Sequence, residues 1–192
     1  MGFTRDELQA FRGVEVPDLL PTGELRLLFV GINPGLWTAA VQTHFAHPAN
    51  RFYPALLRAG ILTDEVSPSA GMTDADRDRF RALGLGITNL VSRATARAAE
   101  LGAAELREGG EHLRALVEAR RPRVVTILGI TAYRQAFGAR RATLGRQDEP
   151  LGPAELWVVP NPSGLNAHET IGSLAAAYAE PARAAGLPLA GS

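Results

Sequence analysis

The sequence predicts an α/β fold, in which helices cover both faces of one parallel sheet to make a three-layer α/β/α sandwich. Three observations support this prediction. The 192 residues are 46% hydrophobic and 21% charged, which is the composition of a globular domain. Four short runs are apolar at nearly every position. Patterns of helical length separate these runs, and strands that alternate with helices favour parallel βαβ units.

Four segments predict buried strands because branched aliphatic side chains fill them almost without interruption. These segments are Leu25–Ile32, Gly86–Val91, Arg123–Leu128 and Glu155–Pro160. A strand that is apolar on both faces belongs in a sheet that is covered on both sides. We therefore expect a central sheet of these four strands, all parallel.

Helical patterns lie between and after the predicted strands. The predicted helices are Ala49–Ala59, Thr73–Leu83, Ala103–Arg121, Thr131–Phe137 and Thr170–Ala185. Asn50 and Thr73 are the expected N-caps of the first two helices, and Gly60 ends the first. The pair Gly109-Gly110 could split the longest helix in two, because glycine weakens a helix interior.

Composition excludes several classes of protein. No cysteine is present, so a disulfide, an iron–sulfur cluster, a thiol nucleophile and a cysteine-ligated zinc site are all excluded. The longest apolar runs, such as residues 124–130, are far shorter than the ~18 residues of a membrane span. Residues 1–7 are polar and mixed in charge, and they do not look like a signal peptide. We expect one intracellular domain over residues 1–192, with its core at about residues 25–180.

Basic residues are unevenly spread although the net charge is zero. All 20 of them are arginine, which is typical of a GC-rich genome when alanine and glycine are also abundant. Residues 93–146 contain 11 arginines and five acidic residues, whereas residues 147–192 contain one arginine and five acidic residues. Guanidinium groups match phosphate oxygens, so the basic segment leaves nucleic-acid binding open without establishing it.

Two predicted strands run directly into turns that combine Asn-Pro with glycine. The turns are residues 31–36 after the first strand and residues 161–168 after the fourth. An Asn before Pro is held extended, and glycine permits the turn that follows. Either segment alone could be an ordinary connection between strand and helix. Two of them at the carboxyl edge of one sheet indicate a binding site, because ligands of such sheets bind there.

These turns and a third segment resemble the mismatch-specific uracil-DNA glycosylase and thymine-DNA glycosylase family. The matching motifs are Gly31-Ile32-Asn33-Pro34-Gly35-Leu36, Phe45-Ala46-His47-Pro48-Ala49-Asn50-Arg51-Phe52 and Asn161-Pro162-Ser163-Gly164-Leu165. Residues 86–91 and 127–129 fit the same family, so the resemblance covers most of the chain. The fold of that family, a central four-stranded parallel sheet between helices, agrees with the predicted elements.

The resemblance implies a monofunctional enzyme that removes uracil, and related damaged or mismatched pyrimidines, from double-stranded DNA. The enzyme would flip the nucleotide out of the duplex and hydrolyse its N-glycosidic bond, which initiates base excision repair. It implies a monomer that acts on duplex DNA with G·U or related lesions, without a cofactor, metal or membrane. It also implies a bacterial protein of the cytoplasm, associated with the nucleoid.

Asn33 is the candidate catalytic residue, because it matches the family residue that orients the nucleophilic water. Its amide oxygen could hold that water close to the anomeric carbon. An asparagine cannot act as a strong base, so we expect a positioning role with a modest rate enhancement. The alternative is a turn asparagine that bonds only its own backbone.

The candidate base pocket consists of Ile32, Thr38, Phe45, His47 and Asn50, each by its match to the family. Phe45 would stack on the flipped base, and Ile32 would contribute backbone groups and packing. Thr38 would contact the substrate or a phosphate, while His47 and Asn50 would order the loop of the pocket. The alternatives are a plain core role for Phe45 and a structural hydrogen bond for His47.

Leu165 matches the wedge that enters the duplex where the target base has left. An exposed apolar side chain on a loop with glycine suits that task. Backbone groups of Ser163 and Gly164 could reach the opposite base or the phosphates, and Asn166 and His168 could add contacts. If Leu165 were buried, the motif would instead be a packing turn.

Two positions depart from the family pattern. Bacterial relatives often carry arginine where this chain has Ala167, so contacts to the guanine opposite the lesion are in question. Many relatives carry an acidic residue where this chain has Ser92, followed by Arg93. Any assistance by a carboxylate at that position is therefore missing.

Other readings of the same residues are weaker. A DNA-binding module of this fold that has lost activity would keep Leu165 but lack a competent pocket. A hydrolase using Ser163 and His168 lacks the nucleophile elbow of such enzymes. A zinc site at His44 and His47 lacks a defined third ligand. A dinucleotide site lacks the required glycine spacing, because Gly31 is followed by glycine only at position 35.

Overall fold

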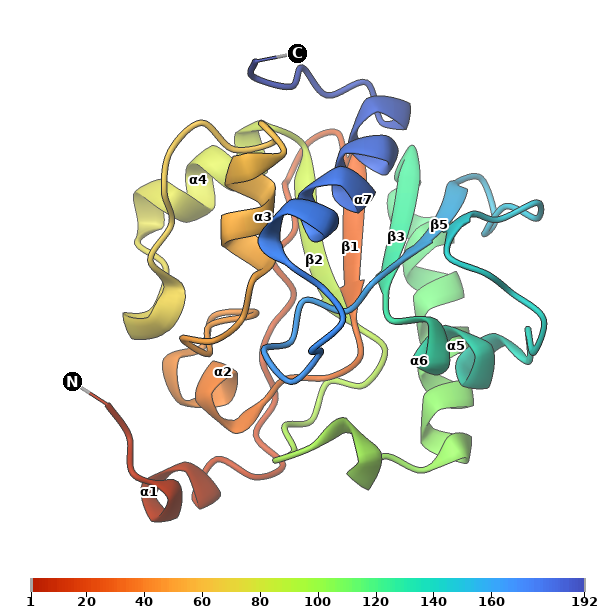
Figure 1. Cartoon of the computed structure of the whole chain (residues 1–192). Helices are drawn as coiled ribbons and strands as arrows, with labels where there is room; N and C mark the ends of the chain where they lie inside the picture. Colours follow the sequence, from red (N-terminus) through yellow and green to blue (C-terminus); the bar gives the residue numbers. More distant parts are fainter. Residues whose placement is uncertain (1, 192) are drawn as a thin grey trace.

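The structure, a computed structural model, describes residues 2–191, so Met1 and Ser192 of the predicted domain lie outside the described residues. Figure 1 shows one twisted sheet with helices on both faces. Its five strands are β1 (Leu27–Gly31), β2 (Leu85–Asn89), β3 (Val124–Leu128), β4 (Gly145–Arg146) and β5 (Glu155–Val159). Their order across the sheet is β2-β1-β3-β5-β4.

The four predicted strands are confirmed as β1, β2, β3 and β5, and all pairings among these four are parallel. The sheet has one strand more than predicted. The extra strand, β4, has only two residues and pairs antiparallel with β5 at the edge. A segment so short, with one exposed and one half-buried residue, has no apolar run that could reveal it.

Two layers of helices complete the predicted sandwich. Helices α3 (Phe52–Arg58), α4 (Asp74–Ala82) and α7 (Ile171–Ala184) contribute side chains to the hydrophobic cluster on one face of the sheet. Helices α5 (Ala103–Arg120) and α6 (Ile130–Phe137) contribute to the cluster on the other face. Alternate residues of β1 enter the two clusters, Phe29 the first and Val30 the second. This alternation explains why the strand is apolar at every position.

The ends of the predicted helices lie within one residue of their expected limits, except at the start of α3. Thr73 caps α4 as predicted, with its side chain accepting from the backbone N–H of Asp76. The predicted helix 49–59 begins only at Phe52, whose backbone N–H donates to Asn50 Oδ1 at 2.9 Å. Asn50 therefore still satisfies a free N–H at the start of the helix, from one position earlier than a normal N-cap.

Helix α5 is continuous, so the possible split at Gly109-Gly110 is not observed. A Cβ on Gly109 would lie 2.2 Å from the carbonyl oxygen of Leu90, and one on Gly110 would lie 3.0 Å from that of Ala136. The two glycines thus allow α5 to approach the segment after β2 and helix α6 closely. Close packing, and not a break in the helix, accounts for the pair.

Four short helical segments were not predicted from the sequence. They are α1 (Arg5–Gln9), α2 (Leu36–Val41), η1 (Pro68–Ala70) and η2 (Ala98–Glu100). Figure 1 shows α2 beside the carboxyl ends of the strands, where it follows β1 directly. Within residues 2–191, no helix is both long and apolar enough to cross a membrane.

Candidate active site

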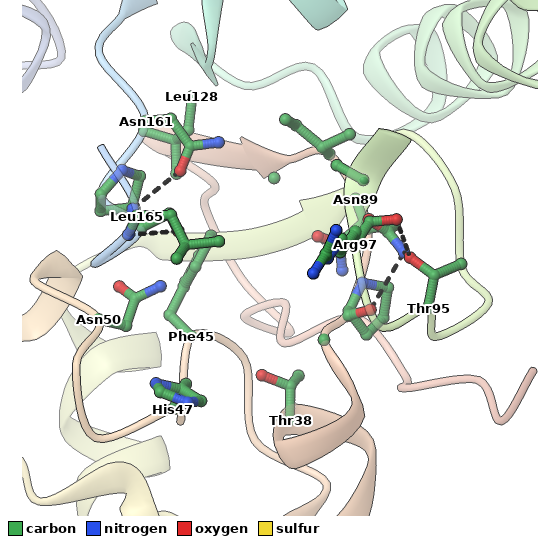
Figure 2. A pocket seen from close by; sticks show the side chains of 18 of the residues that line it. Thr38, Phe45, His47, Asn50, Asn89, Thr95, Arg97, Leu128, Asn161 and Leu165 are labelled. Atoms are coloured by element: carbon green, nitrogen blue, oxygen red, sulfur yellow. Dashed lines mark hydrogen bonds between the residues drawn. The ribbon is translucent and has the colours of Figure 1, made fainter. Parts of the chain in front are cut away.

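A cavity of about 640 Å³ opens at the carboxyl edge of the sheet. Leu128 at the end of β3 lines it together with residues from four segments, which are 31–35 with 38, 44–45 with 47 and 49–50, 89 with 95–99, and 161–165. Both Asn-Pro turns therefore reach one cavity, as their place in the predicted sheet indicates. Figure 2 shows Thr95 and Arg97 on one side of the cavity and Phe45, Asn50 and Leu165 on the other.

Asn33 lines the cavity, and its amide is anchored through nitrogen. Its Nδ2 donates to Thr95 Oγ1 at 2.8 Å and to the carbonyl oxygens of Arg93 and Pro34, both at 3.1 Å. Within residues 2–191 its Oδ1 accepts no hydrogen bond. The anchored nitrogen fixes the direction of a free acceptor, which is the arrangement needed to hold a water molecule. The alternative of an asparagine that bonds only its own turn does not describe Asn33.

Phe45 has an unusual backbone conformation for an aromatic residue. Its φ of +56° lies in the left-handed region, which bulky residues rarely adopt. The ring is half-buried, stacks at 4.2 Å on the buried ring of Phe52, and lines the cavity. A Cβ on Gly31 would lie 3.2 Å from this ring, so the glycine makes room for it. Phe45 thus packs on the core and also borders the cavity, and its stacking on a flipped base stays a prediction.

Thr38 and Ile32 also line the cavity, but each has a structural contact. Thr38 is buried on α2, and its Oγ1 accepts from the backbone N–H of Ala46 at 3.3 Å. This bond holds the turn that carries Phe45. The backbone carbonyl of Ile32 accepts from the N–H of Val91 at 3.0 Å, so it continues the contact between the segments after β1 and β2.

His47 and Asn50 form the adjoining wall of the cavity. His47 is exposed, and its Nδ1 accepts from the backbone N–H of Ala49 at 3.1 Å. Its ring also lies against Trp37, with ring centroids 5.7 Å apart. These contacts are structural hydrogen bonding and packing, which was the alternative reading of His47.

His44 and Asn89 form a pair that no motif in the sequence indicates. His44 is buried, and its Nε2 lies 2.9 Å from the carbonyl oxygen of Pro17, to which only a protonated nitrogen can donate. Burial lowers the pKa of His44 to about 4, although the bond to Pro17 opposes the shift, so the ring is neutral at pH 7. Its Nδ1 is then an acceptor, and Asn89 Nδ2 donates to it at 3.2 Å.

Asn89 is the polar end of β2, pairs in register with Gly31, and lines the cavity. Its amide orientation is set by His44, because only the nitrogen can donate to an unprotonated Nδ1. One signal in the sequence could have revealed Asn89. It is an amide residue at the end of an apolar strand, and that strand lies beside the first strand of the sheet. The partnership with His44 spans 45 positions in sequence and follows only from the fold.

Leu165 projects from the loop between β5 and α7, and 89% of its surface is exposed. It is the most exposed large apolar residue of the described chain, so a packing turn is ruled out. Ser163 and Gly164 line the cavity beside it. A Cβ on Gly164 would lie 2.7 Å from the carbonyl oxygen of Ala49, so this loop lies directly against the wall of the pocket.

Asn166 and His168 do not line the cavity, unlike their neighbours in the motif. Asn166 Nδ2 donates to the carbonyl oxygen of Asn161 at 3.1 Å and so braces the loop. His168 is exposed, and its backbone N–H lies 3.4 Å from Asn166 Oδ1. Within the described residues, no hydrogen bond joins Ser163 to His168 as a hydrolase would need.

No acidic side chain of residues 2–191 lines the cavity. Ser92, at the position that is often acidic in relatives, is exposed and donates to Glu15 Oε1 at 2.9 Å, outside the cavity. No group of three histidine or acidic residues within the described chain is arranged to hold a metal ion. The ring nitrogens of His44 are both occupied by hydrogen bonds, which argues against the zinc reading.

Four of the eleven arginines in the basic segment 93–146 form ion pairs with described residues. Arg93 donates to Glu105 through two nitrogens, and Arg146 lies 3.2 Å from Glu155. Arg97 is exposed, lines the cavity and forms no ion pair with any described residue. The free positive charge of this segment at the cavity therefore belongs to Arg97.

Comparison with known proteins agrees with the geometry of this site. The model of the family "Uracil DNA glycosylase superfamily" matches residues 17–181. The solution NMR structure of a candidate uracil DNA glycosylase from Methanosarcina acetivorans has a similar fold, with a TM-score of 0.62 and 16% sequence identity. The match covers 91% of this chain and 98% of that one. Because the family model covers most of the chain and all the segments that line the cavity, the chain belongs to the uracil DNA glycosylase superfamily.

Proposed function

We propose that this protein is a monofunctional uracil-DNA glycosylase of the mismatch-specific type. Membership of the superfamily supports a DNA glycosylase role. The observation that carries the finer proposal is the joint arrangement around one cavity of Asn33, Phe45 and Leu165. They offer a directed acceptor for water, an aromatic surface and an exposed apolar side chain.

The substrate is a uracil that has left the base stack. A base inside a duplex is shielded by its neighbours, so its nucleotide must rotate into the cavity before the reaction. Leu165 fills the space in the stack and offsets the lost stacking energy. Phe45 covers one face of the flipped ring, which suits any pyrimidine.

Asn89 supports selection of uracil by hydrogen bonding. Its Nδ2 has one N–H bonded to His44, which leaves a second N–H and Oδ1 for a ligand. Uracil presents a carbonyl oxygen beside an N–H on one edge, whereas cytosine presents an amino group beside an acceptor. A fixed amide matches the uracil pattern and mismatches the cytosine pattern at the same place.

Asn33 positions the water that attacks the sugar. As the bond between the base and C1′ breaks, its electron pair leaves with the base and positive charge develops on the sugar. The water held by Asn33 Oδ1 forms the new bond to C1′ and releases its proton to solvent. Because no acidic group of the described chain lines the cavity, the proposal includes no carboxylate base.

A preference for G·U pairs would come from weak pairing more than from contacts to guanine. Ala167 has no side chain that could reach the opposite base, and Asn166 is used to brace the loop. A wobble pair opens more easily than a Watson–Crick pair, so it releases uracil at lower cost. The protein would act as a monomer on duplex DNA in the bacterial cytoplasm, near the nucleoid.

One single-turnover experiment tests this proposal. Excess protein is mixed with labelled duplexes that carry uracil, thymine or ethenocytosine opposite G or A, and abasic sites are revealed by alkaline cleavage. We expect release of uracil from G·U and, more slowly, from A·U. Duplex binding without any base release would instead support the DNA-binding module of the same fold.

A further inference from the structure

Arg51 holds the loop that carries Leu165 through three backbone carbonyl groups. Its Nη2 donates to the carbonyl oxygens of Ser163 at 2.6 Å and Asn166 at 2.7 Å, and its Nη1 donates to that of Glu169. The backbone N–H of Arg51 adds a bond to the carbonyl oxygen of Pro162 at 3.0 Å. One residue before α3 therefore contacts the whole length of a loop more than 100 positions away.

Only a guanidinium group can make these contacts together. Its N–H donors project in a fixed planar fork, whereas a lysine ammonium is a single point on a flexible chain. The arrangement also has a cost, because Arg51 Nε is buried without a hydrogen-bond partner. Among the described residues Arg51 forms no ion pair. Its positive charge therefore interacts with the loop carbonyls, and no carboxylate neutralises it.

The side chain of Leu165 depends on the backbone of this loop for its position. It is 89% exposed, so almost no side-chain packing holds it. The carbonyls of Ser163 and Asn166, on either side of it in sequence, are the two that Arg51 Nη2 holds. Fixing these two groups fixes the direction in which Leu165 projects.

The same arginine joins the loop to the wall of the cavity. Asn50, its neighbour in sequence, lines the cavity, and Gly164 lies directly against Ala49. The loop and the wall at residues 47–50 therefore share one anchor. Movement of Leu165 into a duplex would be linked to the shape of the wall that receives the base.

We infer that Arg51 is a positioning residue that preorganises the loop of residues 161–169, so that Leu165 enters the duplex without a prior ordering step. This inference rests on the proposed function for its consequence in DNA. Preorganisation removes the entropy cost of ordering the loop at the moment of binding. Preorganisation of the loop therefore speeds opening of the base pair and leaves the rate of the bond-breaking step unchanged.

The first test needs no DNA. Amide hydrogen exchange is measured on the free wild-type protein, on Arg51→Lys and on Arg58→Ala. Arg58 is the matched control, because it is exposed at the end of α3 and forms no hydrogen bond with a described residue. We expect Arg51→Lys to raise exchange about tenfold at Ser163, Leu165 and Asn166, with the strands unchanged. Unchanged exchange in this loop would overturn the inference, whatever the protein does to DNA.

The second test separates pair opening from bond breaking. Single-turnover release of uracil is compared on an A·U duplex and on single-stranded DNA, for Arg51→Lys alone and combined with Leu165→Ala. We expect Arg51→Lys to slow release from the duplex by roughly tenfold and from the single strand by less than about twofold. If Arg51 acts through Leu165, Arg51→Lys should slow release by less than about a further twofold in protein that already carries Leu165→Ala.

Equal loss on both substrates, or full additivity with Leu165→Ala, would overturn the inference. The ratio of the two rates within one preparation does not depend on the folded fraction, so a destabilised variant still gives a result. If wild-type protein releases uracil from neither substrate, the proposed function fails, and hydrogen exchange alone decides the role of Arg51.

Discussion

The two Asn-Pro turns at the carboxyl edge of the sheet share a sequence pattern but use their asparagines in opposite ways. Asn33, after β1, donates through Nδ2 to Thr95 and to the carbonyls of Arg93 and Pro34, and its oxygen accepts no bond from the described chain. Asn161, after β5, uses its oxygen within its own turn, where Oδ1 accepts from the backbone N–H of Ser163 at 2.9 Å.

This difference indicates that the turn after β1 can bind a ligand and that the turn after β5 has a structural role. An amide anchored through nitrogen offers a directed acceptor to a ligand, whereas an amide that closes its own turn is part of the backbone scaffold. The turn after β1 can therefore hold water, and the turn after β5 can present Leu165. Sequence alone left both possibilities open for Asn33, because the two turns look alike.

The largest expected effect comes from Asn33→Ala. We expect release of uracil from a G·U duplex to fall on the order of 10²–10³-fold, because the water loses its orienting group. Duplex binding should remain nearly intact, since Asn33 lies inside the cavity and makes no phosphate contact in this account. Single-turnover rates and binding isotherms measure the two effects.

Two further variants test whether the two asparagines differ in role. Thr95→Val keeps Asn33 but removes one anchor of its nitrogen, so its rate should lie between those of wild type and Asn33→Ala. Asn161→Ala should cost far less than Asn33→Ala, because it loosens the turn without touching the water. Equal rates for Asn33→Ala and wild type would remove Asn33 from the mechanism.

The second prediction concerns stability at acidic pH and the bond between His44 and Asn89, the residue that pairs with Gly31 at the end of β1. The pKa of His44 is lowered by burial to about 4 in the folded protein, against ~6.5 in an unfolded chain. Between these values the unfolded chain binds a proton that the folded chain does not. The free energy of unfolding should therefore fall as the pH decreases from about 6.5 to about 4, by about 3 kcal/mol from this group.

Urea unfolding at several pH values measures this effect. His44→Gln should be less stable at pH 7 but should lose part of the slope between pH 6.5 and 4. His168→Gln, which replaces an exposed histidine in the turn after β5, is the control. The same slope in wild type and His44→Gln would show that burial of His44 does not govern acid stability.

The third prediction concerns the turn after β5. Leu165→Ala should slow release from an A·U duplex roughly tenfold, because nothing then offsets the lost stacking. Release from G·U, whose pair opens more easily, should slow less, and non-specific duplex binding should be almost unchanged. Losses of equal size on both duplexes would contradict a role as a wedge.

Most of the fold could be predicted because its signals are local. The four long strands lie within two residues of their predicted limits, since a doubly covered strand is apolar at every position. The strand β4 and the helix α2 were not predicted, because each is too short to show a period. The Gly109-Gly110 pair was ambiguous because its reason, the approach of Leu90 and Ala136, lies elsewhere in the chain.

For the candidate site, the sequence predicts the individual residues and their motifs but not the contacts between them. The structure brings Asn33, Phe45 and Leu165 to one cavity, as the motifs predict. The partnerships that set their geometry could not be predicted. Asn33 with Thr95 and Arg51 with Ser163 join segments 62 and 112 positions apart, and such pairs exist only once the sheet is formed.

The smallest expected effect tests the central claim, which is that Asn33 positions water in a cavity without a general base. The measurement is the single-turnover rate of uracil release from G·U DNA at pH 6.5–8.5, with saturating protein and fixed salt, because DNA binding depends on ionic strength. We predict a change of less than about twofold, since no group that titrates near neutrality acts in the step. A tenfold change that His47→Asn or His168→Asn removes would show that a histidine acts as acid or base and would contradict the account.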